Sequence, residues 1–537
     1  MAVACAPSSS TTTSPLAASP SITDPVLQTA TSARGMVASA SKLATAVGAT
    51  VLAQGGNAVD AAAATSFALA VTEPSMSGLG GRTSIVIKLP NGDVVGVDGL
   101  NQVRRGFRDS TEALDGYTRS AIPGVPAAVI SMVRRYGTWP ISRIIAPAIA
   151  LAENGFPLGP LEATRMAEAA RELRQYSGSR RYFLKPDGSP YAEGDRFVQR
   201  DLARTLRAIS DGGDSAFYRG WIADSIHADM VRNGGFITRE ELAAYQAKPA
   251  IIVRGRYRGH ELVSNYEPAS GHVVIEALQI MERFQLSKRP PAEYASIVGQ
   301  AMQLALADRS RRFGSPDESA RRLTSSEHAA ERARAIGDPA PPSASPRDDE
   351  TWWLRPDQDN TTHLSVVDAN RMAVALTQSL GPSLGSRVSS PGTGFLFATR
   401  LGTVPGSRPG STIAPTIISD STGRTRYVLG AAGDARIISA VIQTVSRLFD
   451  EHLPLEQAVA APRVHPMGHA SLRVERGARI GWTDADVVRL RQLGFQVDTA
   501  PSSYFARVHA VAIDHDARRL NGVAEPRGLG SAAGPRQ

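Results

Sequence analysis

Hydrophobic and polar positions divide the chain into regions of different pattern. Residues 1–32 are rich in Ser, Thr, Ala and Pro without periodicity, so we expect a disordered tail. From about residue 120 to 320 the chain is predicted to be mainly helical, as in the amphipathic segment 203–209, which residues 211–214 interrupt. After Thr361, short apolar and β-branched runs dominate. The first half is therefore predicted to be helix-rich and the last third strand-rich.

The first ordered elements are predicted near the N-terminus. Asn57 is suited to cap a helix that runs from Ala58 toward Val71, and Pro74 ends it. A glycine-rich segment, 77–81, then leads into a strand over 83–87. This order is the reverse of a phosphate-binding loop, and no Gly-Lys-Ser/Thr follows, so close backbone packing in a turn is the better interpretation.

Strands and helices alternate irregularly in the last third of the chain. Residues 335–358 are proline-rich and charged, which predicts a flexible linker before this part. We predict strands at 362–368, 372–379, 393–398, 426–430 and 507–514, and helices at about 434–450 and 484–493. The pattern favours an α+β fold in which sheets lie between layers of helices.

Composition narrows the class of protein. Of the 537 residues, 42% are hydrophobic and 20% are charged, which is typical of a globular protein. The net charge of +8 is spread without a polybasic tract, so nucleic acid is not an expected partner. Cys5 is the single cysteine, which excludes a disulfide or a cysteine-based metal site within one chain. The chain shows neither a secretory signal nor eighteen consecutive apolar residues, so we expect a soluble, cytoplasmic protein without membrane contact.

Two short motifs are poor candidates for the chemistry. Residues 381–385 fit Gly-x-Ser-x-Gly, but the helix that a nucleophile elbow needs cannot follow, because Ser, Pro and Gly dominate the next residues. His465 and His469 have the spacing of a zinc helix, but Pro466 and Gly468 lie between them. No metal and no cofactor are expected.

The boundary between Asn360 and Thr361 has two interpretations from local pattern alone. It is either a surface linker followed by a strand, or a site of self-cleavage. Cleavage there would make the Thr361 hydroxyl a nucleophile and its new α-amino group the base. Local pattern does not decide between the two.

Sequence blocks spread along the chain support the second interpretation. They are 35–39, 55–62, 73–81, 136–138, 216–220, 307–309, 391–394 and, most strongly, Thr-Thr-His-Leu-Ser-Val-Val-Asp from Thr361. In this order they resemble the gamma-glutamyltranspeptidase family of N-terminal nucleophile hydrolases, over about residues 34 to 534.

The resemblance implies a proenzyme with a four-layer αββα sandwich and a mainly helical part in its N-terminal subunit. A large subunit, 33–360, and a small catalytic subunit, 361–537, would stay associated after cleavage before Thr361. Ser379 matches a hydroxyl that hydrogen-bonds the nucleophile, and Gly433 with Asp434 falls where a Gly-Gly pair forms the oxyanion hole. Ser411 and Thr412 match the pair that binds the substrate's α-carboxylate.

Departures from the family pattern concern the substrate. The three positions that bind the γ-glutamyl ammonium in the family hold Gly381, Arg400 and Thr403 here. The family's carboxylate-binding arginine aligns near Leu100, with Arg104 and Arg105 close by. A cation and small residues should repel an ammonium, and one lost charge-assisted hydrogen bond costs about 1.5–3 kcal/mol.

The sequence therefore predicts a self-processing hydrolase or acyltransferase that uses Thr361 and no longer recognises glutathione. Its substrate is expected to be another carboxylate-bearing small molecule, whose acid group meets Arg400 or Ser411. The resemblance also admits a homologue that cleaves a carbon–carbon bond, as in alkylproline antibiotic pathways. A third interpretation is an uncleaved binding protein without activity, against which the retained Thr361 and Ser379 argue.

Overall fold

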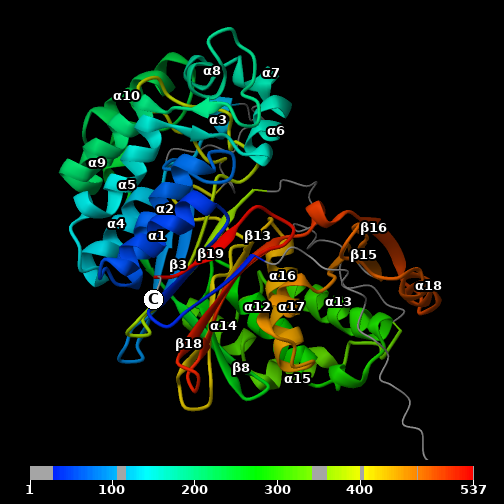
Figure 1. The fold of residues 1–537 in the computed structure, drawn as a ribbon. Helices are drawn as coiled ribbons and strands as arrows, with labels where there is room; N and C mark the ends of the chain where they lie inside the picture. Colours follow the sequence, from blue (N-terminus) through cyan, green and yellow to red (C-terminus); the bar gives the residue numbers. More distant parts are fainter. Residues whose placement is uncertain are drawn as a thin grey trace, which may run out of the picture.

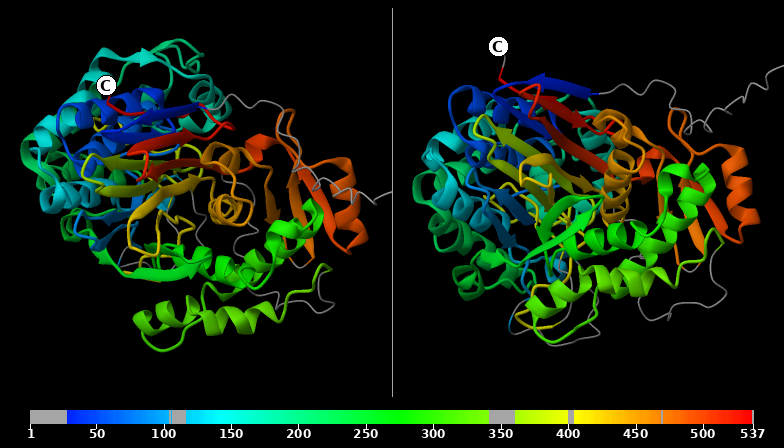
Figure 2. Two further views of the ribbon diagram at one scale, coloured as in Figure 1. Left: turned by 60° about the horizontal axis from the view of Figure 1, so that its bottom comes forward. Right: turned by 90° about the horizontal axis from the view of Figure 1, so that it is seen from below.

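The computed structural model describes residues 28–103, 105, 116–340, 360–399, 404–468 and 470–535. Two antiparallel sheets face each other, and helices cover both outer faces (Figure 1). Figure 2 shows the same layers from two further directions, with the blue and cyan helices on one side of the sheets and the green and orange helices on the other. The predicted αββα sandwich is thereby confirmed.

The first sheet contains the strand that begins beside Thr361. Its order is β19-β2-β10-β11-β3-β4-β7. Every residue of β2, β3, β10 and β11 is buried, because helices cover one face and the second sheet covers the other. The bounds are β2 (Gly35–Ser39), β3 (Arg82–Lys88), β4 (Val94–Gly99), β7 (Lys248–Ala250), β10 (Thr362–Asp368), β11 (Ala373–Ser379) and β19 (Ser531–Ala533).

The second sheet has the order β1-β18-β17-β13-β12-β9-β8. A separate apolar cluster that includes Met36, Val367, Val428 and Val511 fills the space between the two sheets. The bounds are β1 (Gln28–Ser32), β8 (Ile252–Tyr257), β9 (His260–Asn265), β12 (Thr416–Ser419), β13 (Thr425–Ala432), β17 (Arg507–Asp514) and β18 (Arg519–Ala524).

Helix α2 is the centre of the layer over the first sheet, and all of its residues are buried. Asn57 and Asp60 form a capping box at its start, as Asn57 predicts. The helices on this side are α1 (Lys42–Ala53), α2 (Ala58–Thr72), α3 (Gly116–Arg119), α4 (Val125–Tyr136), α5 (Ile141–Asn154), α6 (Pro160–Glu168), α7 (Ala170–Leu173), α8 (Ser177–Phe183), α9 (Arg200–Tyr218), α10 (Trp221–Arg232) and α11 (Arg239–Ala244), with a small ribbon of β5 (Phe156–Pro157) and β6 (Arg196–Phe197).

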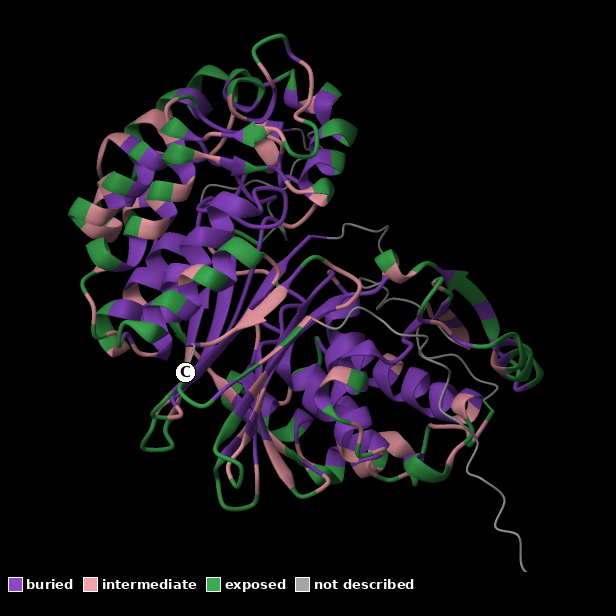
Figure 3. Cartoon of the chain, viewed as in Figure 1, coloured by how far each residue is buried: buried purple, intermediate pink, exposed green. Residues whose placement is uncertain are grey.

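The layer over the second sheet is built on α12 and α16, which are buried over nearly their whole length (Figure 3). A third small sheet and α18 lie beside it. The elements are α12 (Gly271–Met281), α13 (Pro291–Asp308), α14 (Pro316–Leu323), α15 (Ser326–Ala333), α16 (Arg436–Phe449), α17 (Leu455–Ala460), α18 (Asp484–Gln492), β14 (Val464–Pro466), β15 (Ser471–Glu475), β16 (Gln496–Ala500) and the 3₁₀ turns η1 (Leu286–Lys288) and η4 (Ser502–Tyr504). None of the described helices is long and apolar enough to span a bilayer.

The structure corrects two sequence-based boundaries. Residues 28–32, assigned above to the tail, form β1, because five consecutive positions pair with β18. Residues 393–398 are not a strand, and only Phe397 makes an isolated bridge, with Gly80. The apolar side chains there are buried against the helical layer, so burial rather than sheet pairing explains their pattern. Of the predicted linker 335–358, residues 341–358 lie outside the described part.

Candidate active site

Thr361 and Ser379 lie opposite each other at one end of the first sheet. Strands β10 and β11 pair antiparallel with Thr362 opposite Gln378, so the next pair in this register is Thr361 and Ser379. Directly opposed residues in an antiparallel pair point to the same face. The strand pairing therefore brings together two hydroxyls that are eighteen positions apart in the chain.

These two hydroxyls form one hydrogen-bonded group with the peptide bond that precedes Thr361. Ser379 Oγ lies 3.1 Å from Thr361 Oγ1 and 2.6 Å from the carbonyl oxygen of Asn360, and it accepts a hydrogen bond from Gly381 N at 2.9 Å. Thr361 Oγ1 also lies 2.7 Å from that carbonyl oxygen. Since Ser379 has one proton, the consistent arrangement is that it accepts from Gly381 and Thr361 and donates to the Asn360 carbonyl.

Gly433 and Asp434 follow β13 and lie just before α16. Gly433 has φ 143° and Asp434 has φ 50°, in the left-handed region that favours glycine. Asp is among the few other residues that adopt this conformation readily, so the replacement of a glycine by Asp434 is compatible with it. Their position before the N-terminus of α16 favours negative charge.

Ser411 and Thr412 are buried on the segment that leads into β12. Thr412 Oγ1 donates to Asp434 Oδ1 at 3.4 Å, which links the predicted carboxylate-binding pair to the predicted oxyanion pair. The Ser411 carbonyl accepts from Ser270 Oγ at 2.7 Å and from Arg309 Nη2 at 3.1 Å. Burial lowers the pKa of Arg309 to about 10, so Arg309 remains a cation at neutral pH. Its hydrogen bond to the Ser411 carbonyl holds this segment in place.

Arg82 is a buried cation beside these residues that sequence reasoning missed. It opens β3 opposite Ser379, and its Nη1 donates to the Thr399 carbonyl at 3.3 Å and to Asn101 Oδ1 at 3.4 Å. Burial lowers the pKa of Arg82 to about 10, and the charge of Asp434 opposes that shift. A charged first residue in an otherwise buried strand was the sequence signal for it.

Gly381 shows why an asparagine is absent at this point. A Cβ on Gly381 would lie 2.4 Å from Thr399 Oγ1 and 3.3 Å from Arg82 Nη2, and the φ of 89° also disfavours a side chain. The space that an amide side chain would need is therefore occupied by the Arg82 guanidinium and the Thr399 hydroxyl.

Not every predicted site residue lies in the described part of the chain. Arg400, Thr403 and Arg104 fall outside it, so their predicted contacts stay predictions. Leu100 is described and buried, and its carbonyl accepts a hydrogen bond from Tyr245.

Glu73 is a second functional candidate that sequence reasoning missed. It caps the C-terminal end of α2, and its Oε2 accepts a hydrogen bond of 2.9 Å from Thr362 Oγ1, next to Thr361. Burial, with the nearby charge of Glu162, raises the pKa of Glu73 to about 7. The carboxyl can therefore gain or lose a proton near neutral pH.

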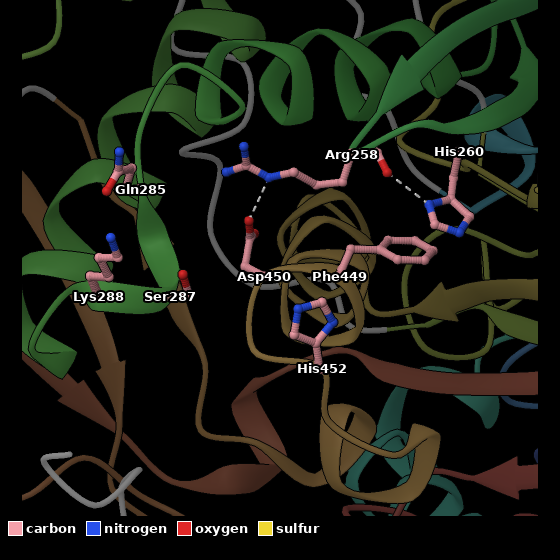
Figure 4. A pocket seen from close by; sticks show the side chains of 8 residues that line it. All are labelled: Arg258, His260, Gln285, Ser287, Lys288, Phe449, Asp450 and His452. Atoms are coloured by element: carbon pink, nitrogen blue, oxygen red, sulfur yellow. Dashed lines mark hydrogen bonds and ion pairs between the residues drawn. The ribbon is translucent and has the colours of Figure 1, made fainter. Parts of the chain in front are cut away.

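Other polar groups of the described chain are less suited to the reaction. A cavity of about 510 Å³ contains Arg258 and Asp450, which pair at 2.7 Å (Figure 4). It lies at the C-terminal end of α16, about 20 Å along the helix from Asp434.

His465 lies in β14 rather than on a helix and contacts Ser439, and His469 is outside the described residues. Glu276, Asp308 and His328 form one buried acidic cluster, but Arg332 Nε lies 2.7 Å from Asp308 and already compensates its charge.

Known proteins are similar to this chain over most of its length. The sequence model of the family "Gamma-glutamyltranspeptidase" matches residues 44–535. The chain is 35% identical over 486 residues to the glutathione hydrolase proenzyme of Escherichia coli K12, covering 83% of each chain. It is 30% identical over 478 residues to the Acylase ACY 1 proenzyme of Pseudomonas sp. strain V22, covering 82% of this chain and 84% of the other. The structure of a cephalosporin acylase from Bacillus halodurans matches all of both chains with a TM-score of 0.85 and 26% identity.

The chain belongs to the gamma-glutamyltranspeptidase family and is an enzyme of the hydrolase and acyltransferase type. Relatives of this family named as glutathione hydrolases and relatives named as acylases are both similar to it, so family membership alone does not select a substrate.

Proposed function

We propose that the chain cleaves itself between Asn360 and Thr361, and that Thr361 then serves as the nucleophile of an amide hydrolase or acyltransferase. The observation that carries this proposal is the hydrogen-bonded group of Thr361, Ser379 and the Asn360 carbonyl. The Thr361 hydroxyl is a nucleophile next to the peptide bond to be broken, and the Ser379 hydroxyl donates a hydrogen bond to the carbonyl oxygen of that bond.

In self-cleavage, Thr361 Oγ attacks the carbonyl carbon of Asn360. The carbonyl oxygen becomes an oxyanion that Ser379 Oγ stabilises. The proton that Thr361 Oγ loses is transferred to the leaving nitrogen as the C–N bond breaks, and this nitrogen becomes the α-amine of Thr361. Water then hydrolyses the resulting ester, which leaves a carboxylate on Asn360 and a free Thr361.

In the proposed catalytic reaction, the same hydroxyl attacks an amide of the substrate. The free α-amine has an ordinary pKa near 8 and takes the Oγ proton as the general base, then gives it to the leaving nitrogen. The backbone N–H groups of Gly433 and Asp434 would stabilise the oxyanion. Water or an acceptor amine releases the acyl group from Thr361.

We propose an acyl group with a carboxylate and without an α-ammonium. Support comes from the side chains around the nucleophile, because Arg82 fills the space next to Gly381 and would repel an ammonium there. The Arg82 guanidinium and the Ser411 hydroxyl provide donors for an acid group. The relatives named as acylases agree with a substrate other than glutathione.

Processing is tested on a denaturing gel with mass spectrometry. The wild-type chain is expected to give fragments 1–360 and 361–537, with the second starting at Thr361. Thr361→Ala should leave one full-length chain, whereas Thr361→Ser should still process because it keeps the hydroxyl. An active preparation with only the full-length chain would contradict the proposal.

Two chromogenic substrates that differ by one group test the specificity. Glutaryl-p-nitroanilide and γ-glutamyl-p-nitroanilide share the carboxylate and the amide, and only the second has the α-ammonium. We expect the glutaryl compound to have the higher kcat/KM, by about tenfold or more. The E. coli glutathione hydrolase, assayed in parallel, is the control that prefers the γ-glutamyl compound. A preference of this protein for the γ-glutamyl compound would refute the proposed specificity.

A second candidate reaction is cleavage of a carbon–carbon bond next to a carbonyl. The specific observation in its favour is the combination of an intact Thr361–Ser379 pair with an altered ammonium-binding region. Mass analysis of products from an acyl-diketone probe would distinguish it, because the fragment that leaves would carry a new C–H bond instead of an amine.

A further inference from the structure

A second pocket lies beside the start of β10, near Thr362 and separate from the residues proposed to hold the acyl group. Its cavity volume is about 420 Å³, and it lies between the loop after α2 and the segments around β17 and β19. Leu43, Phe156 and Leu161 contribute apolar walls, and Glu73, Arg507 and His509 contribute polar groups. None of Ser379, Ser411, Thr412, Gly433 and Asp434 lines it.

Arg507 and His509 bring nitrogen atoms into this pocket that have no hydrogen bond from a described residue, while the Arg507 charge also acts on Glu73 and Glu162. Arg507 Nη2 and both ring nitrogens of His509 are buried, and none has a hydrogen bond among the described residues. The Arg507 residue is 9% exposed and His509 is 1% exposed. Leaving such groups unpaired is unfavourable, most of all for a charged group, so a ligand that accepts from them would be stabilised.

The remaining polar side chains of the pocket restrict the ligand. Glu162 is already paired, since its two oxygens accept from the backbone and hydroxyl of Ser75 and Arg165 lies 3.8 Å away. Glu73 is engaged with Thr362 through one oxygen. Glu193 and Lys42 also line the pocket. With three carboxyls around it, a doubly charged phosphate would be repelled more strongly than a single carboxylate. The apolar walls favour a ligand with a hydrocarbon body.

We propose that this pocket is a second ligand site, which binds a small monocarboxylic acid with an apolar body. The carboxylate accepts from Arg507 and His509, and the body packs against Leu43, Phe156 and Leu161. Because Glu73 lines the pocket and also holds Thr362, a bound ligand contacts the group that fixes the residue after Thr361. The site does not depend on which residue is the nucleophile.

Calorimetric titration of the purified protein tests the site, with 3-phenylpropanoate as the probe and 3-phenylpropanamide as its neutral match. We expect the acid to bind and the amide to bind about tenfold or more weakly, since it cannot form the charge-assisted contact with Arg507. No binding of the acid at millimolar concentration, or equal binding of acid and amide, would overturn the proposal. Preference for 3-phenylpropylamine would also overturn it, because the carboxyls would then dominate the pocket.

Variants locate the bound acid. Arg507→Gln should weaken binding about tenfold or more, Arg507→Lys should retain part of it, and the exposed control Arg519→Gln should leave it unchanged. Thr412→Val, in the proposed acyl site, should not alter this binding. If Thr412→Val abolished binding and Arg507→Lys did not weaken it, the acid would occupy the acyl site and the second site would be refuted. If Arg507→Gln does not fold, the comparison of acid and amide binding in the wild-type protein and the binding of the acid to Arg507→Lys still test the proposed site.

Discussion

The hydroxyl of Ser379 is the group whose removal tests the processing geometry most directly. Ser379→Ala removes the donor that lies 2.6 Å from the Asn360 carbonyl oxygen, and the acceptor that lies 3.1 Å from Thr361 Oγ1. It leaves Thr361, Asn360 and the backbone of β11 in place. Ser379→Thr restores the hydroxyl on a β-branched residue that suits a strand.

The expected magnitude follows from the charge that develops on the Asn360 oxygen. Loss of one donor to an oxyanion costs about 2.7–4 kcal/mol in the transition state, which corresponds to about 10²–10³ in rate. The same change costs the folded precursor only about 1 kcal/mol, as for an ordinary buried hydrogen bond. Processing should therefore slow far more than stability falls.

Cell-free synthesis followed by denaturing gels at intervals measures the rate of processing, and urea unfolding of the precursor measures stability. Thr205→Val is a matched control, because Thr205 also donates to a main-chain carbonyl, that of Thr393 at 2.8 Å, away from Thr361. It should lose stability without a change in processing rate. If Ser379→Ala processed as fast as wild type, the hydrogen-bonded group would not be the processing machinery.

Three further changes give separate expectations. Gly381→Asn should lower the free energy of unfolding by about 1–3 kcal/mol in urea unfolding, because the asparagine side chain would collide with Thr399 and Arg82 at a positive φ. Unchanged stability would mean that these neighbours move aside. Arg82→Gln should raise KM for glutaryl-p-nitroanilide about tenfold or more, with a smaller effect on the KM for the γ-glutamyl compound. Equal effects on both compounds would refute the proposed role of Arg82 in binding the acid group. The Glu73 carboxyl has its pKa raised from 4.5 to about 7, so the folded state holds a proton that the unfolded state loses, and stability should fall as the pH rises between these values. Glu73→Gln should reduce that fall by about 1–3 kcal/mol between pH 5 and 8 in urea unfolding, and an unchanged pH dependence would show that Glu73 does not titrate in this range.

Local sequence signals predicted the helices and strands whose formation depends on neighbouring residues in the chain. Asn57 begins α2 because its side chain satisfies free N–H groups of the first turn, whatever lies around the helix. The run after Thr361 is a strand because β-branched residues favour extended backbone, and β10 covers the predicted residues 362–368. Local pattern failed at 393–398, where apolar residues serve burial without pairing.

The candidate site was predictable where the family pattern holds and not where long-range contacts decide. Thr361 and Ser379 could be named because the sequence around them resembles the family, whereas local pattern alone left the role of Thr361 undecided. Arg82 and Glu73 could not, because burial lowers the pKa of Arg82, and burial with the distant Glu162 raises the pKa of Glu73. A pKa shift needs burial and neighbours, and neither is a property of one position in the chain.

The sequence by itself determined the family and the strand that follows Thr361, which is β10 (Thr362–Asp368). The tertiary structure alone decided that Arg82 occupies the space beside Gly381 and that Asp434 adopts a conformation suited to glycine. It also decided that Arg507 Nη2 is buried at a pocket without a hydrogen bond from a described residue. The physical reason is that propensity and periodicity act within a few residues, whereas the charge, free space and hydrogen bonding of a site are set by strands that meet only after folding.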